Sequence, residues 1–165
     1  MGAFGAEMME TYLLVKWIHV LSSTLLFGTG LGIAFFMWMA HLRGDAAHIA
    51  ATARTVVIAD ACFTAPAVVV QFLSGLWLAR FLGMPLDYSW LRVALWLFVL
   101  VGCCWLPVLW LQVRARDLAR AAAAQGMPLP RQYRVVMGWW FALGWPAFIG
   151  VMAIFWLMVA KPDGL

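Results

Sequence analysis

The sequence predicts an all-α protein: an integral membrane four-helix bundle with short loops. Two observations carry this prediction. Hydrophobic residues make up 66% of the 165 residues and charged residues only 11%, so the side chains cannot coat a water-exposed surface. In addition, four apolar runs each exceed the roughly 20 residues that a helix needs to cross about 30 Å of hydrocarbon. These features exclude a water-soluble globular fold and intrinsic disorder.

The four predicted spans belong to one transmembrane domain, residues 1–165, and cover residues 12–40, 56–82, 90–113 and 135–160. Backbone groups in lipid must be hydrogen-bonded within their own segment, and no barrel-type alternation is present, so the spans are predicted to be helices. The first span follows Glu7 and Glu10 and is too long for a cleaved signal peptide. We therefore retain it as a helix.

Three connections remain, at residues 41–55, 83–89 and 114–134. The third contains the basic, alanine-rich run RARDLARAAAAQG, which is typical of an interfacial continuation of the preceding helix ending at Gly126. Prolines inside the last three spans, Pro66, Pro107 and Pro146, are expected to kink their helices.

The distribution of arginine predicts the orientation. The first and third connections share one face and carry Arg43, Arg54, Arg114, Arg116, Arg120, Arg131 and Arg134. The opposite face carries Lys16, Arg80, Arg92 and Lys161. Because positive residues favour the cytoplasm, both termini are expected on the outer face. The net charge of +4 is therefore an orientation signal, and no basic stripe suited to nucleic acid is present.

Polar residues within the spans form two stripes at helical spacing. One consists of Tyr12, Lys16, His19 and Ser23, and the other of Asp60, Thr64, Gln71 and Gly75. In an antiparallel hairpin, His19 is expected opposite Gly75, with Gln71 and Ser74 around it. Such costly residues in a membrane indicate a functional site or interhelical hydrogen bonds.

His19 is the candidate metal ligand, because neutral imidazole is a common axial ligand of haem and Gly75 offers space for a macrocycle. The predicted haem b site consists of His19, Lys16, Ser23, Gln71, Ser74, Gly75, Arg80 and Arg92. The three basic residues would meet the haem propionates. The alternative is that His19 only joins two helices through hydrogen bonds.

Two further features lie within the spans. Asp60 is predicted to be structural, paired with Arg54 or with an arginine of the third connection. Gly28 and Gly32 form a GxxxG pattern, which permits close helix packing within the bundle or in a homodimer.

Several segments resemble a bacterial family of four-helix predicted integral membrane proteins of unknown function. These are YLLVKWIHVLSSTLLFGTGLG, DACFTAPAVVVQFLSG, Tyr133 with Trp139–Trp140, and the closing MVAKP. More distantly, K-W-I-H, the mid-helix proline, W-L-R and V-A-K-P resemble HemJ-type protoporphyrinogen oxidases and CopD-like membrane proteins.

The HemJ resemblance implies a haem b oxidoreductase of the bacterial inner membrane with His19 as an essential residue, linked to quinone or porphyrin chemistry. Arg92 stands where that family has an essential lysine, which argues against protoporphyrinogen oxidation. The competing function is a non-enzymatic membrane module, either an assembly factor or a subunit of a metal or solute pathway.

Overall fold

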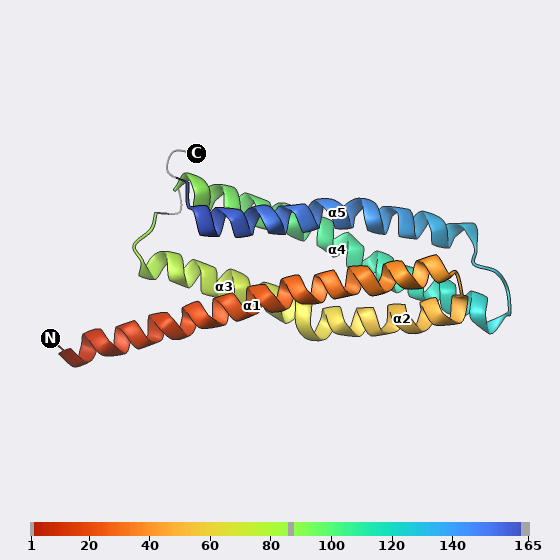
Figure 1. Cartoon of the computed structure of the whole chain (residues 1–165), viewed down its shortest axis with the longest axis horizontal. Helices are drawn as coiled ribbons and strands as arrows, with labels where there is room; N and C mark the ends of the chain where they lie inside the picture. Colours follow the sequence, from red (N-terminus) through yellow and green to blue (C-terminus); the bar gives the residue numbers. More distant parts are fainter. Residues whose placement is uncertain (1, 86–87, 163–165) are drawn as a thin grey trace.

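The computed structural model describes residues 2–85 and 88–162, which contain helices and short connections and no strand. The helices are α1 (Gly2–Arg43), α2 (Ala46–Ala59), the π-helical segment η1 (Asp60–Thr64), α3 (Ala65–Phe81), α4 (Ser89–Ala124) and α5 (Arg131–Ala160) (Figure 1). Because α2, η1 and α3 are continuous, they form one unit. With α1, α4 and α5 this gives four units long and apolar enough to cross a membrane, as predicted.

The first connection is much shorter than expected. Residues 41–55 were predicted to be a loop, but only Gly44 and Asp45 lie outside the helices. Gly44 ends α1 with a positive φ of 72°, and the carboxylate of Asp45 caps α2 by accepting a 2.7 Å hydrogen bond from the backbone N–H of His48. Polar residues beyond the apolar run therefore continue the helices, and α1 and α2 extend past the predicted spans.

The third connection follows its prediction more closely. The helix α4 continues through the basic, alanine-rich segment to Ala124, and Gly126 ends this region with a φ of 61°. Pro107 and Pro146 lie inside α4 and α5, which continue past them.

Pro66 has a visible effect on the second unit. A proline ring clashes with the carbonyl four residues before it, which here belongs to Cys62. The turn before the proline is widened into η1, where the backbone N–H of Ala65 bonds to the carbonyl of Asp60 five residues earlier. The π-helical turn relieves the clash and changes the face on which the following residues lie.

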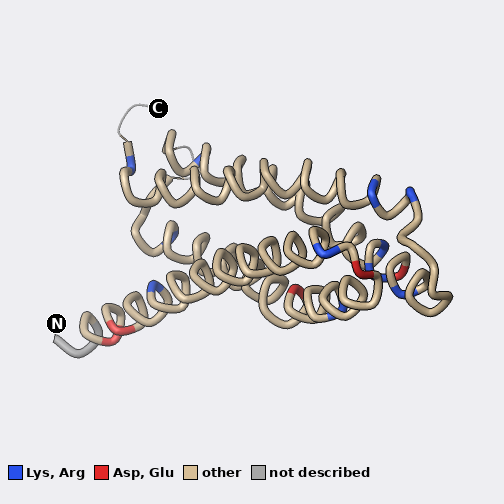
Figure 2. Tube along the Cα trace, turned by 45° about the vertical axis from the view of Figure 1, so that its right-hand side comes forward, with Lys and Arg blue, Asp and Glu red and all other residues tan. Residues whose placement is uncertain are grey.

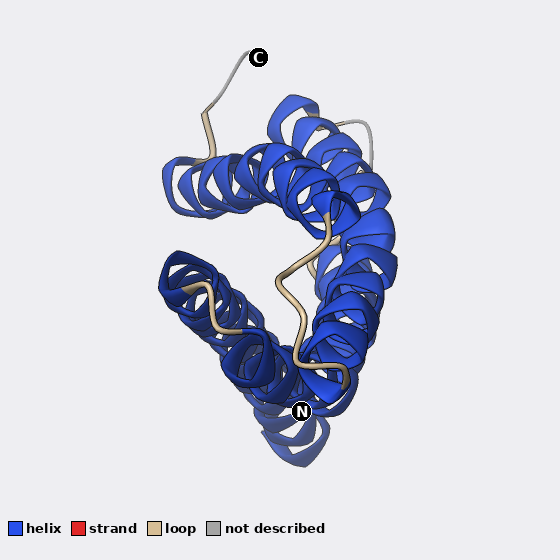
Figure 3. Ribbon diagram, turned by 90° about the vertical axis from the view of Figure 1, so that its right-hand side faces the viewer, coloured by secondary structure: helices blue, strands red, loops and turns tan. Residues whose placement is uncertain are grey.

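The helices form an open arrangement when viewed from the end (Figure 3). The most extensive packing is between α4 and α5, between α2 and α4, and between α1 and α3. Large aromatic side chains bridge α1 to α5: Phe27 stacks on Phe148 and Trp38 meets Phe141 edge to face, with ring centroids 5.5 and 5.1 Å apart. Helix α4 thus packs closely on α2 and α5, whereas α1 and α5 meet through aromatic rings.

The main core lies toward the end of the bundle that carries the α1–α2 and α4–α5 connections. Its most deeply buried members include Met37, Ile49, Ala115, Tyr133 and Met137. A smaller cluster, formed by Ala79, Trp90, Leu91, Ala94 and Leu157, lies near the opposite end. Of the helices α1 and α3, only α3 contributes a residue to the smaller cluster, namely Ala79. Contacts outside this cluster therefore join α1 to α3.

The outer surface of the helices is apolar. Trp96, Trp110 and Trp156 are each more than 60% exposed, as suits side chains that face lipid. Lysine and arginine gather toward the two ends of the bundle (Figure 2). This distribution supports a membrane-spanning fold.

Candidate functional site: a histidine network between two helices

His19 of α1 lies half-buried against α3, with both ring nitrogens in hydrogen bonds. Its Nδ1 is 2.8 Å from the hydroxyl oxygen of Ser74, and its Nε2 is 2.9 Å from the amide nitrogen of Gln71. Antiparallel packing of α1 and α3 brings together these residues, which are more than 50 positions apart in the chain. The structure thus places Gln71 and Ser74 around His19, as the two polar stripes indicated.

The donors in this network define the tautomer of the histidine. With the amide nitrogen of Gln71 facing the ring, Nε2 of His19 accepts from it and the ring proton is on Nδ1. The Nδ1–H then donates to Ser74, whose hydroxyl donates to the carbonyl of Val70 at 2.6 Å. On the other side, the hydroxyl of Ser22 donates to Oε1 of Gln71 at 2.5 Å. Each polar atom of the imidazole has a partner.

Gly75 allows the imidazole to sit this close to α3. A Cβ atom at position 75 would stand 3.1 Å from Cε1 of His19, which is closer than nearly all real Cβ contacts. The space made by the missing side chain is therefore filled by the imidazole. Gly75 was expected to leave room for a macrocycle at this point, and in the structure the imidazole occupies that room.

Ser23 is not part of the network, and Ser22 is. The hydroxyl of Ser23 donates to the carbonyl of Val20 on its own helix at 2.7 Å. Ser22, in contrast, is buried and reaches Gln71. Adjacent residues point about 100° apart on a helix, and the angle at which α1 meets α3 decides which of the two faces inward. The sequence offered two adjacent serines. The predicted polar stripe included Ser23, whereas Ser22 is the serine that faces α3.

The three basic residues predicted to bind propionates are exposed at the surface. Lys16 lies 5.6 Å from the ring centroid of Tyr12, one helical turn away. Arg80 and Arg92 are exposed, and within residues 2–85 and 88–162 neither they nor Lys16 form a hydrogen bond or ion pair with the network. The structure therefore brings together four of the eight predicted residues: His19, Gln71, Ser74 and Gly75.

Asp60 has surroundings that the sequence did not predict. It is 4% exposed, and the polar side chains near its carboxyl group are those of Thr64, Gln112 and Trp105. The predicted pairing with Arg54 is absent from the described residues, whose single ion pair joins Arg116 to Asp117 at 2.8 Å. Arg54 precedes Asp60 by six residues, a spacing that puts the two side chains on different faces of a helix.

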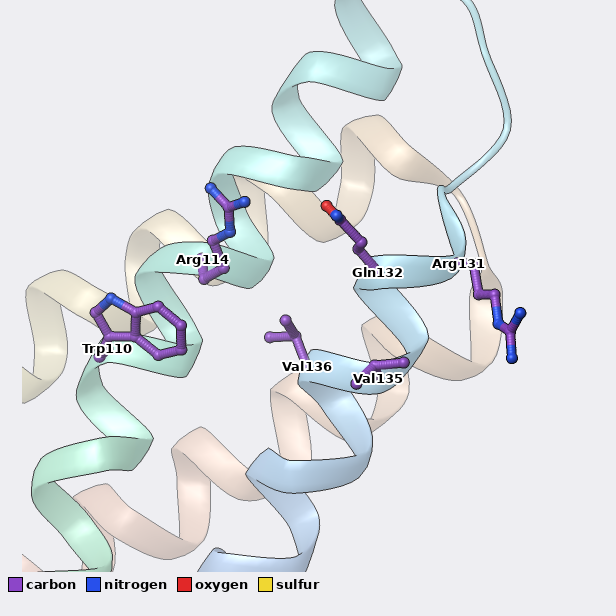
Figure 4. Close-up of a pocket in the computed structure, with 6 residues that line it drawn as sticks. All are labelled: Trp110, Arg114, Arg131, Gln132, Val135 and Val136. Atoms are coloured by element: carbon purple, nitrogen blue, oxygen red, sulfur yellow. The ribbon is translucent and has the colours of Figure 1, made fainter.

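A surface groove lies between α4 and α5, near the connection that joins them (Figure 4). It has a volume of about 370 Å³ and is lined by Trp110, Arg114, Arg131, Gln132, Val135 and Val136. Figure 4 shows the Arg114 and Gln132 side chains near one end of the groove, while Arg131 points away from it. An arginine above an apolar floor suits the boundary between lipid headgroups and acyl chains.

The ligand chemistry of the described residues is limited. No group of three or more His, Cys, Asp or Glu side chains lies together in the parts of the chain that the structure describes. A single histidine ligand is compatible with a five-coordinate haem.

The family comparison covers nearly the whole chain. The family model described as "Predicted integral membrane protein (DUF2269)" matches residues 13–162. The chain belongs to the DUF2269 family. No curated protein and no solved structure matches it. The matched region includes most of the first membrane-crossing unit, the other three units, the His19 network and Asp60.

Proposed function

We propose that this DUF2269 protein is a haem-b-binding protein of the bacterial inner membrane, with Nε2 of His19 as the iron ligand. One observation carries the proposal: the network fixes the proton on Nδ1 and leaves the lone pair on Nε2. Histidines that bind metals almost always donate their other ring N–H to a neighbouring acceptor, and Ser74 is that acceptor here. This hydrogen bond from Nδ1 to a neighbouring acceptor supports the proposal.

The site can accept haem at Nε2 of His19 only if the side chain of Gln71 moves. Its amide nitrogen lies where a group bound to Nε2 would have to approach, 2.9 Å from that atom. The side chain of Gln71 is long and flexible, so rotation about its χ angles can release Nε2 while Ser74 continues to hold Nδ1. The imidazole fills the space above Gly75, so haem would be held by His19 without occupying that space.

A bound haem b supplies one-electron transfer, and the protein's part is to bind and orient it. Quinones and porphyrins are the proposed redox partners, in keeping with the HemJ and CopD resemblance of K-W-I-H and V-A-K-P. Lys16, Arg80 and Arg92 are exposed and can reorient toward propionates or another anionic group.

The proposed orientation places both termini and His19 on the outer side of the membrane. The connections at Gly44–Asp45 and at residues 125–130 then face the cytoplasm with their arginine-rich flanks. The site would therefore lie in the outer half of the bilayer.

A second function is favoured by a specific observation. The His19 network is already complete, because Gln71, Ser74 and Ser22 satisfy one another without any ligand. Such a network is what a non-enzymatic module needs to hold two helices together, either as an assembly factor or as a subunit of a metal or solute pathway.

An absorption spectrum separates the two functions. The full chain is expressed with ample haem and purified in detergent, and it is expected to show a Soret band with about one haem per protein. His19→Ala should lose that band. His41→Ala is the matched control, because His41 lies on the same helix and meets Tyr133 at 3.3 Å, away from the network. The control should keep the band.

The measurement also has outcomes that contradict haem binding. If the wild-type protein carries no haem, or if His19→Ala retains the full amount, His19 only joins helices and the module becomes the better function. Circular dichroism of each variant shows whether the helices have survived the substitution.

A further inference from the structure

A second polar cluster lies in the membrane-spanning part, where Asp60 of η1 is near the side chain of Gln112 of α4. We define the Asp60 cluster as Asp60 and Thr64 of η1 with Gln112 of α4. Their side chains are 4%, 5% and 2% exposed, respectively. Each contains a buried oxygen atom without a hydrogen-bond partner among the described residues: Oδ2 of Asp60, Oγ1 of Thr64 and Oε1 of Gln112.

Three unpartnered polar atoms in one cluster lower the stability of the folded protein considerably. Leaving a buried polar group without a partner costs roughly 1–3 kcal/mol, and a buried unpaired carboxylate costs more. Native proteins satisfy nearly all such atoms, so each exception points to a missing partner such as an ion or water. The position in a π-helical turn agrees with this, because π-helical turns often occur at functional sites.

The chemistry of the three atoms defines what is missing. All three are oxygens that can accept, and one belongs to the only acidic side chain in the cluster. Within residues 2–85 and 88–162, neither Arg54 nor another basic side chain forms an ion pair with Asp60. The hydroxyl of Thr64 can donate to the carboxyl group of Asp60, whereas Oε1 of Gln112 can only accept. A cation contacts several such oxygens at once.

We propose that the Asp60 cluster is a binding site for a monovalent hard cation, with sodium as the ion that it takes. Hard cations prefer oxygen ligands from carboxylate, hydroxyl and amide groups, which is the set present here. A charge of +1 neutralises the single carboxylate, whereas a divalent ion would leave a net charge in the low-dielectric interior. The proposal is independent of haem binding at His19.

The test measures sodium binding by the full chain in detergent. Thermal unfolding is followed by circular dichroism in sodium chloride, potassium chloride and choline chloride at equal ionic strength, and radioactive sodium binding is measured by equilibrium dialysis. A ligand that binds only the folded state raises the unfolding temperature. We expect sodium to raise it by about 5 °C relative to choline, with one ion bound per protein.

Two variants test the ligands. Asp60→Asn keeps the shape of the side chain and should abolish both the sodium-dependent shift and sodium binding. Thr64→Val removes one oxygen with little change of volume and should weaken binding about tenfold. Thr55→Val is the matched control, because Thr55 is exposed on α2 and bonds only to the carbonyl of Ala51 on its own helix. It should bind sodium like the wild type.

Three outcomes would overturn the proposal. Equal unfolding temperatures in the three salts with no bound sodium would show that no cation site exists. A temperature that rises on acidification and ignores sodium would assign the cluster to a proton. Retention of sodium binding by Asp60→Asn would place the ion elsewhere.

Discussion

Gly75 lies directly against His19, so that a Cβ atom at this position would come within 3.1 Å of the imidazole. The glycine therefore lets the imidazole approach α3 closely. A larger side chain must displace the ring from Ser74 and Gln71 or push the two helices apart.

The first prediction concerns this contact. Gly75→Leu should lower the free energy of unfolding by about 2–3 kcal/mol, because overpacking forces the helices apart and breaks the hydrogen bonds of His19. The free energy is measured by denaturant or thermal unfolding in detergent. Gly138→Leu is the control: a Cβ atom there meets nothing within 4 Å. If both variants are equally stable, the close approach of Gly75 and His19 is not needed for packing.

The second prediction separates two adjacent serines. Ser22→Ala should cost about 1 kcal/mol of unfolding free energy, since it leaves Oε1 of Gln71 without its donor. Ser23→Ala should change stability by less than about 0.5 kcal/mol, because Ser23 bonds only within its own helix. Thermal unfolding of both variants under one set of conditions checks the difference. A larger loss for Ser23→Ala would mean that α1 is rotated relative to α3.

The third prediction is the topology. Single cysteines at Gly44 and Gln125, in a variant whose three native cysteines are replaced, should be protected from an impermeant thiol reagent in intact cells. A cysteine at Thr11 near the N-terminus should react. The reason is the excess of arginine beside Gly44 and Gln125. The reverse labelling pattern would move the His19 network to the cytoplasmic half of the membrane.

The fourth prediction concerns association through the GxxxG pattern. A Cβ atom added at Gly28 meets nothing within 4 Å, and one at Gly32 meets only Phe36 of the same helix at 4.0 Å. The pattern therefore remains available on the bundle surface for a second copy of the chain. Gly28→Leu should convert a homodimer to a monomer, as measured by light scattering in detergent. A monomeric wild type would show that the pattern has no role in association.

The four membrane-crossing helices could be predicted because their signal is composition over about 20 residues, which needs no knowledge of neighbours. Helix ends were less predictable. The run from His41 to Thr55 contains polar residues that end an apolar span, yet α1 and α2 remain helical through most of it. Loss of hydrophobicity marks the edge of the membrane, and a helix can continue beyond that edge.

The site could be predicted in part for the same reason. Spacing along one helix placed His19 on the correct face, and antiparallel packing placed it beside Gly75. The choice between Ser22 and Ser23 depends on the angle between two helices, which no single segment contains. Similarly, the partners of Asp60 are far away on α4, and the widened turn before Pro66 rotates this residue away from a simple helical stripe.

The uneven distribution of the core has a consequence for motion. The half of the bundle around Met37, Ile49 and Met137 contains the larger buried apolar core, whereas the contact of α1 with α3 around His19 is rich in polar side chains. Local opening requires the loss of fewer contacts in the second half, so amide hydrogens of α3 should exchange with solvent deuterium sooner than those of α4 near Ala115. The end of the bundle that carries the α1–α2 and α4–α5 connections is therefore expected to stay closed when other parts open.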